Sequence, residues 1–429
     1  MFAKKTIRDV DLQGKRVLLR ADYNVPIDEN GVITADFRVR QSIQTIRALL
    51  EQNVRLVICS HLGRPEGKRD AKYTLRPVAL RLSELLGQDV KFVEDCVGSS
   101  VQAVADALLP GQVLLLENVR FYPGEEANDD GFAAELAKLA DVFVQDGFGV
   151  VHRAHATTDA ITHHLPSVAG LLLEKEVDTL TNAIQNPKRP LMTIVAGAKI
   201  ADKIDVLNRF IDIADFVAVG GAMANTFLAA RGLEIGKSKY DADDLELARE
   251  ILRRAEEKEN NQHFVFFLPQ DGVVAKECDK SAATRLVDWD ADLISEVQSY
   301  PKLPDESTHT VADDEMILDI GPFSAAFIAG AAQNAGTVIW NGTVGVTEVP
   351  ALNDPVGPFS HGTEVIVDAL TGGYGARPFS IVGGGDTVGY VEQQKLTAAF
   401  NHVSTGGGAS LELLSGRKLP GVEALQDKN

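Results

Sequence analysis

Short apolar runs alternate with amphipathic helical patterns along the whole chain. In the first half, the runs predict strands at residues 16–20, 55–59, 90–93, 113–116 and 142–145, with helical patterns such as 39–50 and 75–86 between them. In the second half, they predict strands at 192–195, 216–219, 264–268, 316–318, 338–340 and 380–382. Continuous apolar strands separated by helices are typical of parallel sheets covered on both faces. The pattern therefore predicts an α/β fold of the doubly wound, Rossmann-like class.

The chain is too long for one ordinary core, so its 429 residues predict two domains. Between the halves, Pro166 and Ser167 resemble a helix start with Ser167 as N-cap, and Asn186 and Pro187 resemble its end. We therefore expect a domain over residues 1–168, a linking helix within 169–190, and a second domain from residue 191 to about 407.

Composition and charge exclude several classes of protein. The hydrophobic content is 45% and no apolar run approaches a membrane span, so we expect a soluble, cytoplasmic chain that does not contact a membrane. The net charge of −19 argues against nucleic acid as a partner. Residues 1–168 are nearly balanced, with 20 Lys and Arg against 23 Asp and Glu. Thirteen of those cations are arginines, which suit bidentate binding of phosphate or carboxylate.

A glycine-rich corner lies at residues 379–387, FSIVGGGDT. A buried strand, three glycines and a helix start form an anion site, because backbone N–H groups and the helix dipole favour negative charge. The residues expected to bind phosphate here are Gly384, Gly385, Asp386 and Thr387. Asp386 also stands where a phosphate-bound metal needs a carboxylate. A tight turn with Asp386 as an ordinary N-cap is the alternative.

Loops after the strands of the first half carry polar and basic side chains. Because ligands bind beyond the carboxyl ends of parallel strands, we expect these side chains to converge at one edge of the sheet. They are Asp22 and Asn24 after the first strand, His61 and Arg64 after the second, Arg120 after the fourth, Arg153 after the fifth, and Arg38 at the start of the first helix. The cluster favours a pocket for a phosphate and a carboxylate.

Loops of the second half suit a nucleotide. Lys199 and Lys203 follow a strand, and their spacing of four places them on one face of a helix. Gly197, Gly220, Asn341 and Glu348 also follow strands, and Glu348 could accept a ribose hydroxyl. The chain contains neither GxxxxGK[ST] nor GxGxxG, which argues against a P-loop enzyme or a nicotinamide dehydrogenase.

Two metal readings are weak. The histidines 152, 155, 163 and 164 lack a carboxylate or cysteine in register for zinc. Asp288, Asp290 and Asp292 begin like a calcium loop but lack its glycine and closing glutamate.

A phosphate-binding module without catalysis is the remaining alternative to an enzyme. It would be favoured by loss of Arg38 or Lys199, both of which are present.

The chain closely resembles the phosphoglycerate kinase family. The matching stretches are RADYNVP, SHLGRPEGK, LENVRFYPGEEAND, HRAHAT, GAKIADKI, GGAMANTF, DIGP, WNGTVGV, GGGDT and STGGGASLE. The resemblance implies a kinase of glycolysis. It would transfer a phosphoryl group between 1,3-bisphosphoglycerate and ADP, giving 3-phosphoglycerate and ATP with Mg²⁺ as cofactor.

The resemblance also implies roles for single residues. Asp22, Asn24, Arg38, His61, Arg64, Arg120 and Arg153 would hold the phosphoglycerate. Gly197, Lys199, Lys203, Gly220, Asn341, Glu348 and the loop 384–387 would hold the nucleotide, with Asp386 on magnesium. Arg38, Lys199 and Lys203 would be catalytic. The family further implies a monomer that closes about a hinge, with a C-terminal tail, residues 408–429, that returns to the N-terminal domain.

Four positions depart from the family pattern: Ala196, Phe323, Thr343 and Thr347. They are expected to cluster around the nucleoside and to affect nucleotide affinity rather than the reaction.

Overall fold

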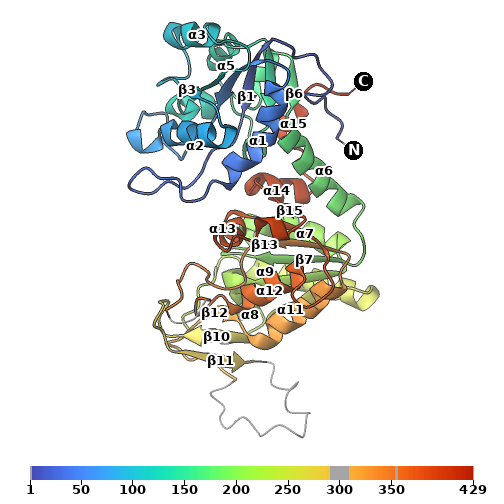
Figure 1. Ribbon diagram of the computed structural model, residues 1–429. Helices are drawn as coiled ribbons and strands as arrows, with labels where there is room; N and C mark the ends of the chain where they lie inside the picture. The colour runs from blue at the N-terminus through green and yellow to red at the C-terminus, as the bar shows by residue number, and fades with distance from the viewer. Residues whose placement is uncertain (1, 290–308, 353–355, 429) are drawn as a thin grey trace. The chain divides into compact units, whose positions relative to one another are not determined.

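The computed structural model describes residues 2–289, 309–352 and 356–428. The chain divides into two units, each with its own sheet (Figure 1). The first unit comprises Met1–Thr181 and Thr405–Asn429, and the second comprises Asn182–Ser404. Among the described residues, no helix is long and apolar enough to cross a membrane.

The first unit is built on a six-stranded parallel sheet in the order β3-β4-β2-β1-β5-β6. Its strands are β1 (Arg16–Arg20), β2 (Arg55–Cys59), β3 (Val90–Phe92), β4 (Val113–Leu115), β5 (Val142–Gln145) and β6 (Ser167–Ala169). The first five confirm the predicted strands to within one residue at each end. The doubly wound α/β class is therefore confirmed for this unit.

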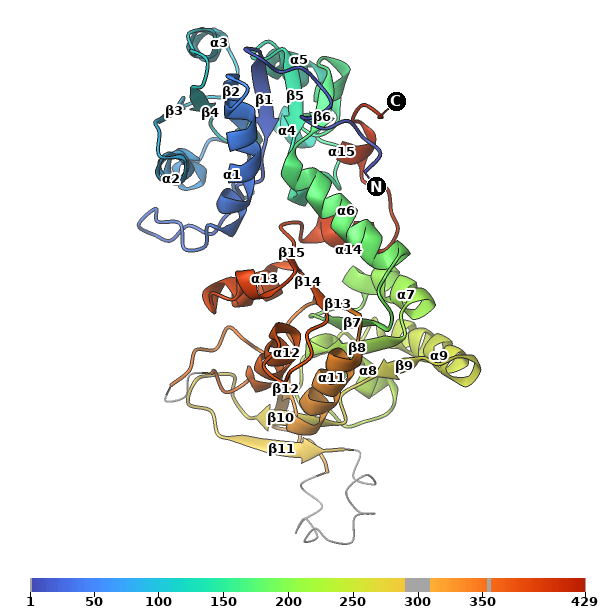
Figure 2. The same cartoon turned by 45° about the vertical axis from the view of Figure 1, so that its right-hand side comes forward.

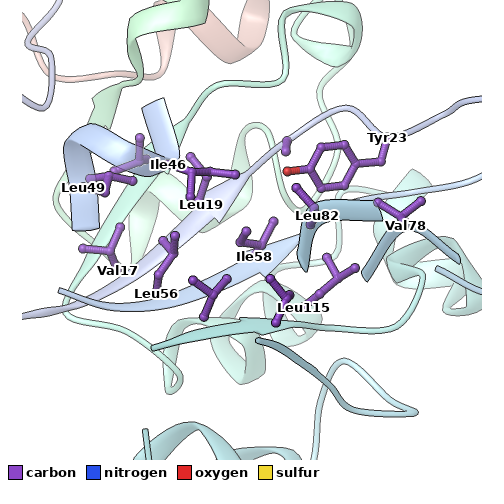
Figure 3. Close-up of a cluster of buried hydrophobic side chains, with 14 of the residues drawn as sticks. Val17, Leu19, Tyr23, Ile46, Leu49, Leu56, Ile58, Val78, Leu82 and Leu115 are labelled. Atoms are coloured by element: carbon purple, nitrogen blue, oxygen red, sulfur yellow. The ribbon is translucent and has the colours of Figure 1, made fainter. Parts of the chain in front are cut away.

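Helices cover both faces of this sheet: α1 (Phe37–Leu50), α2 (Arg76–Leu86), α3 (Ser99–Asp106), α4 (Pro123–Glu126) and α5 (Asp130–Ala137). Successive residues of β1 point to opposite faces, so Val17 and Leu19 pack against α1 and α2, whereas Leu18 packs on the side of α3 and α5. Figure 3 shows the first of these cores, where side chains of β1, β2 and β4 meet those of α1 and α2. Burial on both faces explains why the strands are continuous apolar runs.

The C-terminal segment belongs to the first unit. It carries α14 (Gly408–Leu414) and α15 (Pro420–Glu423), and in both views α15 lies beside β6 and the N-terminus (Figures 1 and 2). The Gly421 N–H donates to Val151 O at 2.9 Å, and Lys4 forms an isolated antiparallel bridge with Asp427.

One predicted helix boundary is wrong. Ser167 does not cap a helix; it begins β6, which pairs with β5, and the linking helix α6 (Leu171–Gln185) starts four residues later. The N–H groups at the start of α6 donate to side chains that lie far away in the sequence. Asp146 Oδ1 accepts from Leu172 N at 2.9 Å, and Thr45 Oγ1 accepts from Leu171 N at 3.1 Å. A cap supplied by other elements leaves no local signal in the sequence.

The second unit has a six-stranded parallel sheet in the order β15-β14-β13-β7-β8-β9. Its strands are β7 (Leu191–Ala196), β8 (Phe216–Gly220), β9 (Val265–Phe267), β13 (Thr337–Asn341), β14 (Phe379–Gly383) and β15 (His402–Val403). Its helices are α7 (Ile204–Ile213), α8 (Gly221–Ala230), α9 (Leu245–Asn261), α11 (Pro322–Asn334), α12 (His361–Thr371) and α13 (Gly385–Gln393). In both views α11 and α12 lie side by side (Figures 1 and 2).

A second, smaller sheet in this unit was not predicted. The strands β10 (Asp271–Ala275), β11 (Thr284–Asp288) and β12 (Met316–Ile320) form an antiparallel sheet in the order β11-β10-β12. The predicted strand 316–318 therefore exists but does not join the parallel sheet. β11 leaves several side chains exposed, as antiparallel strands with one face in solvent do, so it lacks the apolar run of the parallel strands.

Each parallel sheet has a point where the strand order reverses. In the first unit β2 and β5 flank β1, and in the second β8 and β13 flank β7. Ligands of such sheets bind beyond the carboxyl ends of the strands at this switch point. The residues just after β1, β5, β7 and β13 are therefore the first to consider for a site.

Candidate active site

In the first unit, loops after β1 and β2 and the start of α1 interlock. Arg38 Nη1 donates to Asn24 O at 2.8 Å and lies 3.5 Å from Asp22 Oδ2. The Gly63 N–H donates to Asn24 Oδ1 at 2.9 Å, and His61 Nδ1 lies 3.9 Å from Asp22 Oδ1. The structure thus brings four of the predicted residues together at the switch-point edge, as the strand pattern predicted.

The remaining arginines differ in burial. Arg120 is buried, donates from Nη1 to Gly63 O at 2.9 Å, and has its Nε 3.2 Å from Glu126 Oε1. Arg64 and Arg153 are exposed. The side chain of Arg64 makes no hydrogen bond or ion pair with any residue that the structure describes, although its neighbour Gly63 is held by Asn24 and Arg120. We call Asp22, Asn24, Arg38, His61, Arg64, Arg120 and Arg153 the arginine cluster.

A buried ion pair beneath this cluster was missed by the sequence reading. Arg20 and Glu125 are both fully buried with their charged atoms 3.7 Å apart, and Thr157 Oγ1 accepts from Arg20 Nε at 2.7 Å while donating to Glu125 at 2.6 Å. Burial raises the pKa of Glu125, and Arg20 and Thr157 offset part of this rise. No sequence pattern links residues this far apart.

Burial, with a smaller contribution from the arginines, keeps the nearby histidines neutral. Burial, with Arg20, Arg120 and Arg38 nearby, lowers the pKa of His61 well below its usual range. The same causes, burial first and Arg120 second, lower the pKa of His155 to about 4. Arg20 Nη2 is a donor 3.3 Å from His61 Nδ1, so the neutral His61 accepts there and carries its proton on Nε2.

In the second unit a cavity of about 380 Å³ opens beyond the ends of β7 and β13 and along β12. Among the predicted residues, Gly197, Glu348 and Asp386 line it. Much of the remaining lining is apolar and includes Leu228, Pro269, Trp289 and Met316. A mostly apolar pocket with a few polar groups at its rim suits a nucleoside.

Lys203 lies at the switch point between β7 and β13. Its Nζ donates to Ala196 O and to Asn341 Oδ1, the latter at 2.5 Å, and burial lowers its pKa to about 8. Asn341 is itself buried, and its Nδ2 has no hydrogen-bond partner among the described residues. A buried amide donor without a partner is costly, so it is an expected contact for a ligand.

Lys199 does not share a helical face with Lys203, so that prediction is wrong. A 3₁₀ turn spans Ala201–Lys203 and α7 begins only at Ile204, which places Lys199 before any helix. Its Nζ lies 3.0 Å from Asp241 Oδ2 instead. The spacing rule for residues four apart holds only inside a continuous helix.

The predicted glycine corner is formed as a strand, a turn and a helix. Gly384 is the N-cap of α13 with φ of 91°, a conformation that favours glycine, and Asp386 is exposed in the first turn. Thr387 Oγ1 accepts from Gly342 N at 2.7 Å, which ties the corner to the loop after β13. At Gly342 a Cβ would lie 1.9 Å from Ala196 O, so no side chain fits there.

Some predicted residues lie beside the cavity rather than in its lining. A Cβ at Gly220 would lie 2.7 Å from Val344 Cγ1, so a glycine here allows the loop that carries Val344 to pack closely. Gly221, rather than Gly220, lines the cavity. Of the four family departures, Thr343 lines the cavity, whereas Phe323 stacks on Phe327 with ring centroids 6.2 Å apart. The expected clustering of all four around the nucleoside stays a prediction.

The two weak metal readings gain no support. His163 and His164 face Asp130, at 3.6 and 2.9 Å. His155 is buried, and its pKa is lowered by burial first and then by Arg120, Arg20, Arg153 and His152. The four histidines thus belong to two separate places. Asp290 and Asp292 lie outside the described residues.

Comparison with known proteins gives one consistent result. The family model described as phosphoglycerate kinase matches residues 7–417. The chain is 46% identical to the phosphoglycerate kinase of Moorella thermoacetica over 427 residues, which is 100% of both chains. It is also 46% identical to that of Chloroflexus aggregans, covering 99% of both.

Two solved structures are similar throughout. One is the phosphoglycerate kinase of Coxiella burnetii, with a TM-score of 0.79, 36% identity and 98% of both chains covered. The other is that of Pyrococcus horikoshii, with a TM-score of 0.82, 29% identity, and 99% of this chain and 98% of that one covered.

Proposed function

The chain belongs to the phosphoglycerate kinase family, and from that membership we propose that its two units divide the substrates between them. The chain catalyses the reversible transfer of a phosphoryl group from 1,3-bisphosphoglycerate to ADP, a step of glycolysis that yields 3-phosphoglycerate and ATP. The arginine cluster of the first unit binds the phosphoglycerate, and the cavity of the second unit binds ADP or ATP.

The observation that carries the first assignment is the gathering of cationic side chains at the switch-point edge of the first sheet. Burial first, and then Arg20, Arg120 and Arg38, lower the pKa of His61. Arg64 and Arg153 are exposed, and a small anion with a phosphate and a carboxylate suits such guanidinium groups through charge-assisted hydrogen bonds. We assign the guanidinium groups of Arg64 and Arg153 and the Nε2–H of His61 to that ligand as donors.

The second assignment is carried by donors at the switch point. The phosphates of the nucleotide lie against the glycine corner at the start of α13, where backbone N–H groups and the helix dipole favour anions. The unpartnered Nδ2 of Asn341 and the Nζ of Lys203 complete this corner. The base and ribose occupy the apolar part of the cavity, with Glu348 at its rim.

Asp386 fits a magnesium ion that arrives with the nucleotide. Mg²⁺ is bound through one or two carboxylates together with substrate phosphates rather than by a cage of protein ligands. Asp386 is exposed and lines the cavity, and its charge offsets part of the lowering of the Lys203 pKa by burial. The ion, when bound, neutralises phosphate charge.

The chemistry needs alignment and charge neutralisation rather than proton transfer. In the ATP-forming direction the acceptor is a phosphate oxygen, and in reverse it is a carboxylate, and neither needs a general base at pH 7. Phosphoryl transfer spreads charge over three oxygens, and fixed cations stabilise that charge. We assign this role to Arg38, Lys199 and Lys203, the three cations that the resemblance to the family implies at the transferred group.

Separate calorimetric titrations of the two ligands test the division of substrates. Arg120→Ala should weaken binding of 3-phosphoglycerate and leave Mg-ADP unchanged, whereas Asn341→Ala should do the reverse. Equal losses for both ligands in either variant would contradict the assignment. Size-exclusion chromatography with light scattering tests the expected monomer against the chain mass of 46.2 kDa.

A further inference from the structure

Lys199 is held by a carboxylate that no nucleotide role accounts for. Its Nζ lies 3.0 Å from Asp241 Oδ2, and the hydrogen bond to Asp241 raises the pKa of Lys199. The side chain of Lys199 is 57% exposed, whereas that of Asp241 is only 20% exposed. The lysine is therefore the mobile partner of this pair, and the aspartate is the fixed one.

The backbone around Asp241 fixes its carboxylate. Asp243 N donates to Asp241 Oδ1 at 3.3 Å, which leaves Oδ2 directed at Lys199, and Asp241 N donates to Thr226 Oγ1 at 3.2 Å. A second carboxylate of the same segment reaches the same loop, because Asp244 Oδ2 accepts from Ala201 N at 3.0 Å. The segment 241–244 thus holds both a cation and a backbone donor of the loop that follows β7.

We propose that Asp241 is a positioning residue that holds Lys199 in the nucleotide-free protein and competes with the nucleotide phosphates for it. This inference rests on the proposed function, in which Lys199 stabilises the transferred phosphoryl group. In the absence of nucleotide, Asp241 keeps the flexible lysine ordered. When Mg-ADP or Mg-ATP binds, the Nζ leaves the single carboxylate for phosphate oxygens.

The competition has a calculable consequence. Separating an exposed ion pair costs little, and this cost is subtracted from the affinity for nucleotide. Exposed ion pairs are weak, and breaking one changes a dissociation constant by no more than roughly five-fold. Removing the charge of Asp241 should therefore tighten the binding of Mg-ADP by up to about five-fold.

Asp241→Asn is the informative variant, because the amide oxygen can still accept from Asp243 N and preserve the turn. Calorimetric titration with Mg-ADP should give a lower Kd, and steady-state kinetics should give a lower KM for Mg-ADP with an undiminished kcat. Asp241→Glu should restore the original values. Asp243→Asn is the matched control, since Asp243 is exposed in the same segment. It is not among the carboxylates that raise the pKa of Lys199, which are Asp241, Asp202 and Asp244.

A double-variant cycle separates this inference from the proposed function. In the Lys199→Ala background, Asp241→Asn should no longer change the Kd. Suppose that Lys199→Ala loses turnover. If Asp241→Asn then binds Mg-ADP no more tightly than Asp243→Asn, or if it loses kcat at constant KM, the role of Asp241 is wrong and that of Lys199 stands. If Lys199→Ala retains full turnover and affinity, the role of Lys199 is wrong and that of Asp241 falls with it.

Discussion

Replacing Arg64 by alanine should separate substrate binding from stability. Arg64 is exposed, and its side chain has no hydrogen bond or ion pair within the part of the chain that the structure describes. Its removal should therefore change the free energy of unfolding by less than about 0.5 kcal/mol, as surface substitutions do. The melting temperature should shift by less than about 2 °C.

The effect on binding follows from its place in the arginine cluster. A charge-assisted hydrogen bond to phosphate or carboxylate contributes about 1.5–3 kcal/mol. Its loss should raise the KM for 3-phosphoglycerate by roughly 10- to 150-fold, since each 1.4 kcal/mol is a factor of ten. The KM for Mg-ATP should change less than about two-fold, because Arg64 belongs to the first unit and the nucleotide cavity to the second.

Lys68→Ala is the matched control. Lys68 lies in the same loop and is exposed. Replacing it by alanine removes the same charge as Arg64→Ala does, but no contact between Lys68 and the substrate is proposed. Initial rates at varied 3-phosphoglycerate, in parallel with thermal melts of both variants, make the comparison. Equal changes in KM for the two variants would show that only the total positive charge of the loop matters, and the proposed contact would be refuted.

Three further predictions follow from the same geometry. Asn341→Asp should raise the Kd for Mg-ADP at least about ten-fold, because it replaces a buried donor by a negative charge that repels phosphate. The Kd for 3-phosphoglycerate is the control. Because the pKa of His155 is about 4 when folded against 6.5 ordinarily, the unfolded chain binds the extra proton, so stability should fall as the pH drops from about 6.5 to 4. Thermal melts should show a smaller fall in His155→Gln, and an identical fall would contradict the shift. Because in-line transfer needs reacting atoms about 3–3.5 Å apart in a site without bulk water, the radius of gyration should decrease only when both substrates are bound. An unchanged value in small-angle scattering would count against closure.

Five strands of each parallel sheet were predictable because both of their faces are buried, whereas the edge strands β6 and β15 were not predicted. In β1 the central residues 17–19 are all apolar and fully buried, and that leaves a continuous run in the sequence. The site loops were predictable for the same reason, since parallel strands end at one edge. Asp22, Asn24, His61 and Arg38 meet there although they come from three separate segments.

Features fixed by distant partners were not predictable. The start of α6 depends on Asp146 and Thr45, which lie far away in the sequence, so the local reading chose Ser167 wrongly. The partner of Lys199 is Asp241, and the choice between a helix and a 3₁₀ turn after β7 decides which way the lysine points. In the antiparallel sheet, β11 has a weak apolar pattern because part of it faces solvent.

The turnover of Lys199→Ala tests the account most directly, because the account assigns catalysis to fixed cations rather than to a general base. The purified chain and the variant should be compared with 3-phosphoglycerate and Mg-ATP at saturation, by following ATP-dependent formation of 1,3-bisphosphoglycerate in a coupled assay. Loss of one charge-stabilising group should lower kcat by about 10²-fold or more. The fold and the affinity for 3-phosphoglycerate should be unchanged. A kcat near that of the unaltered chain would contradict the proposed mechanism.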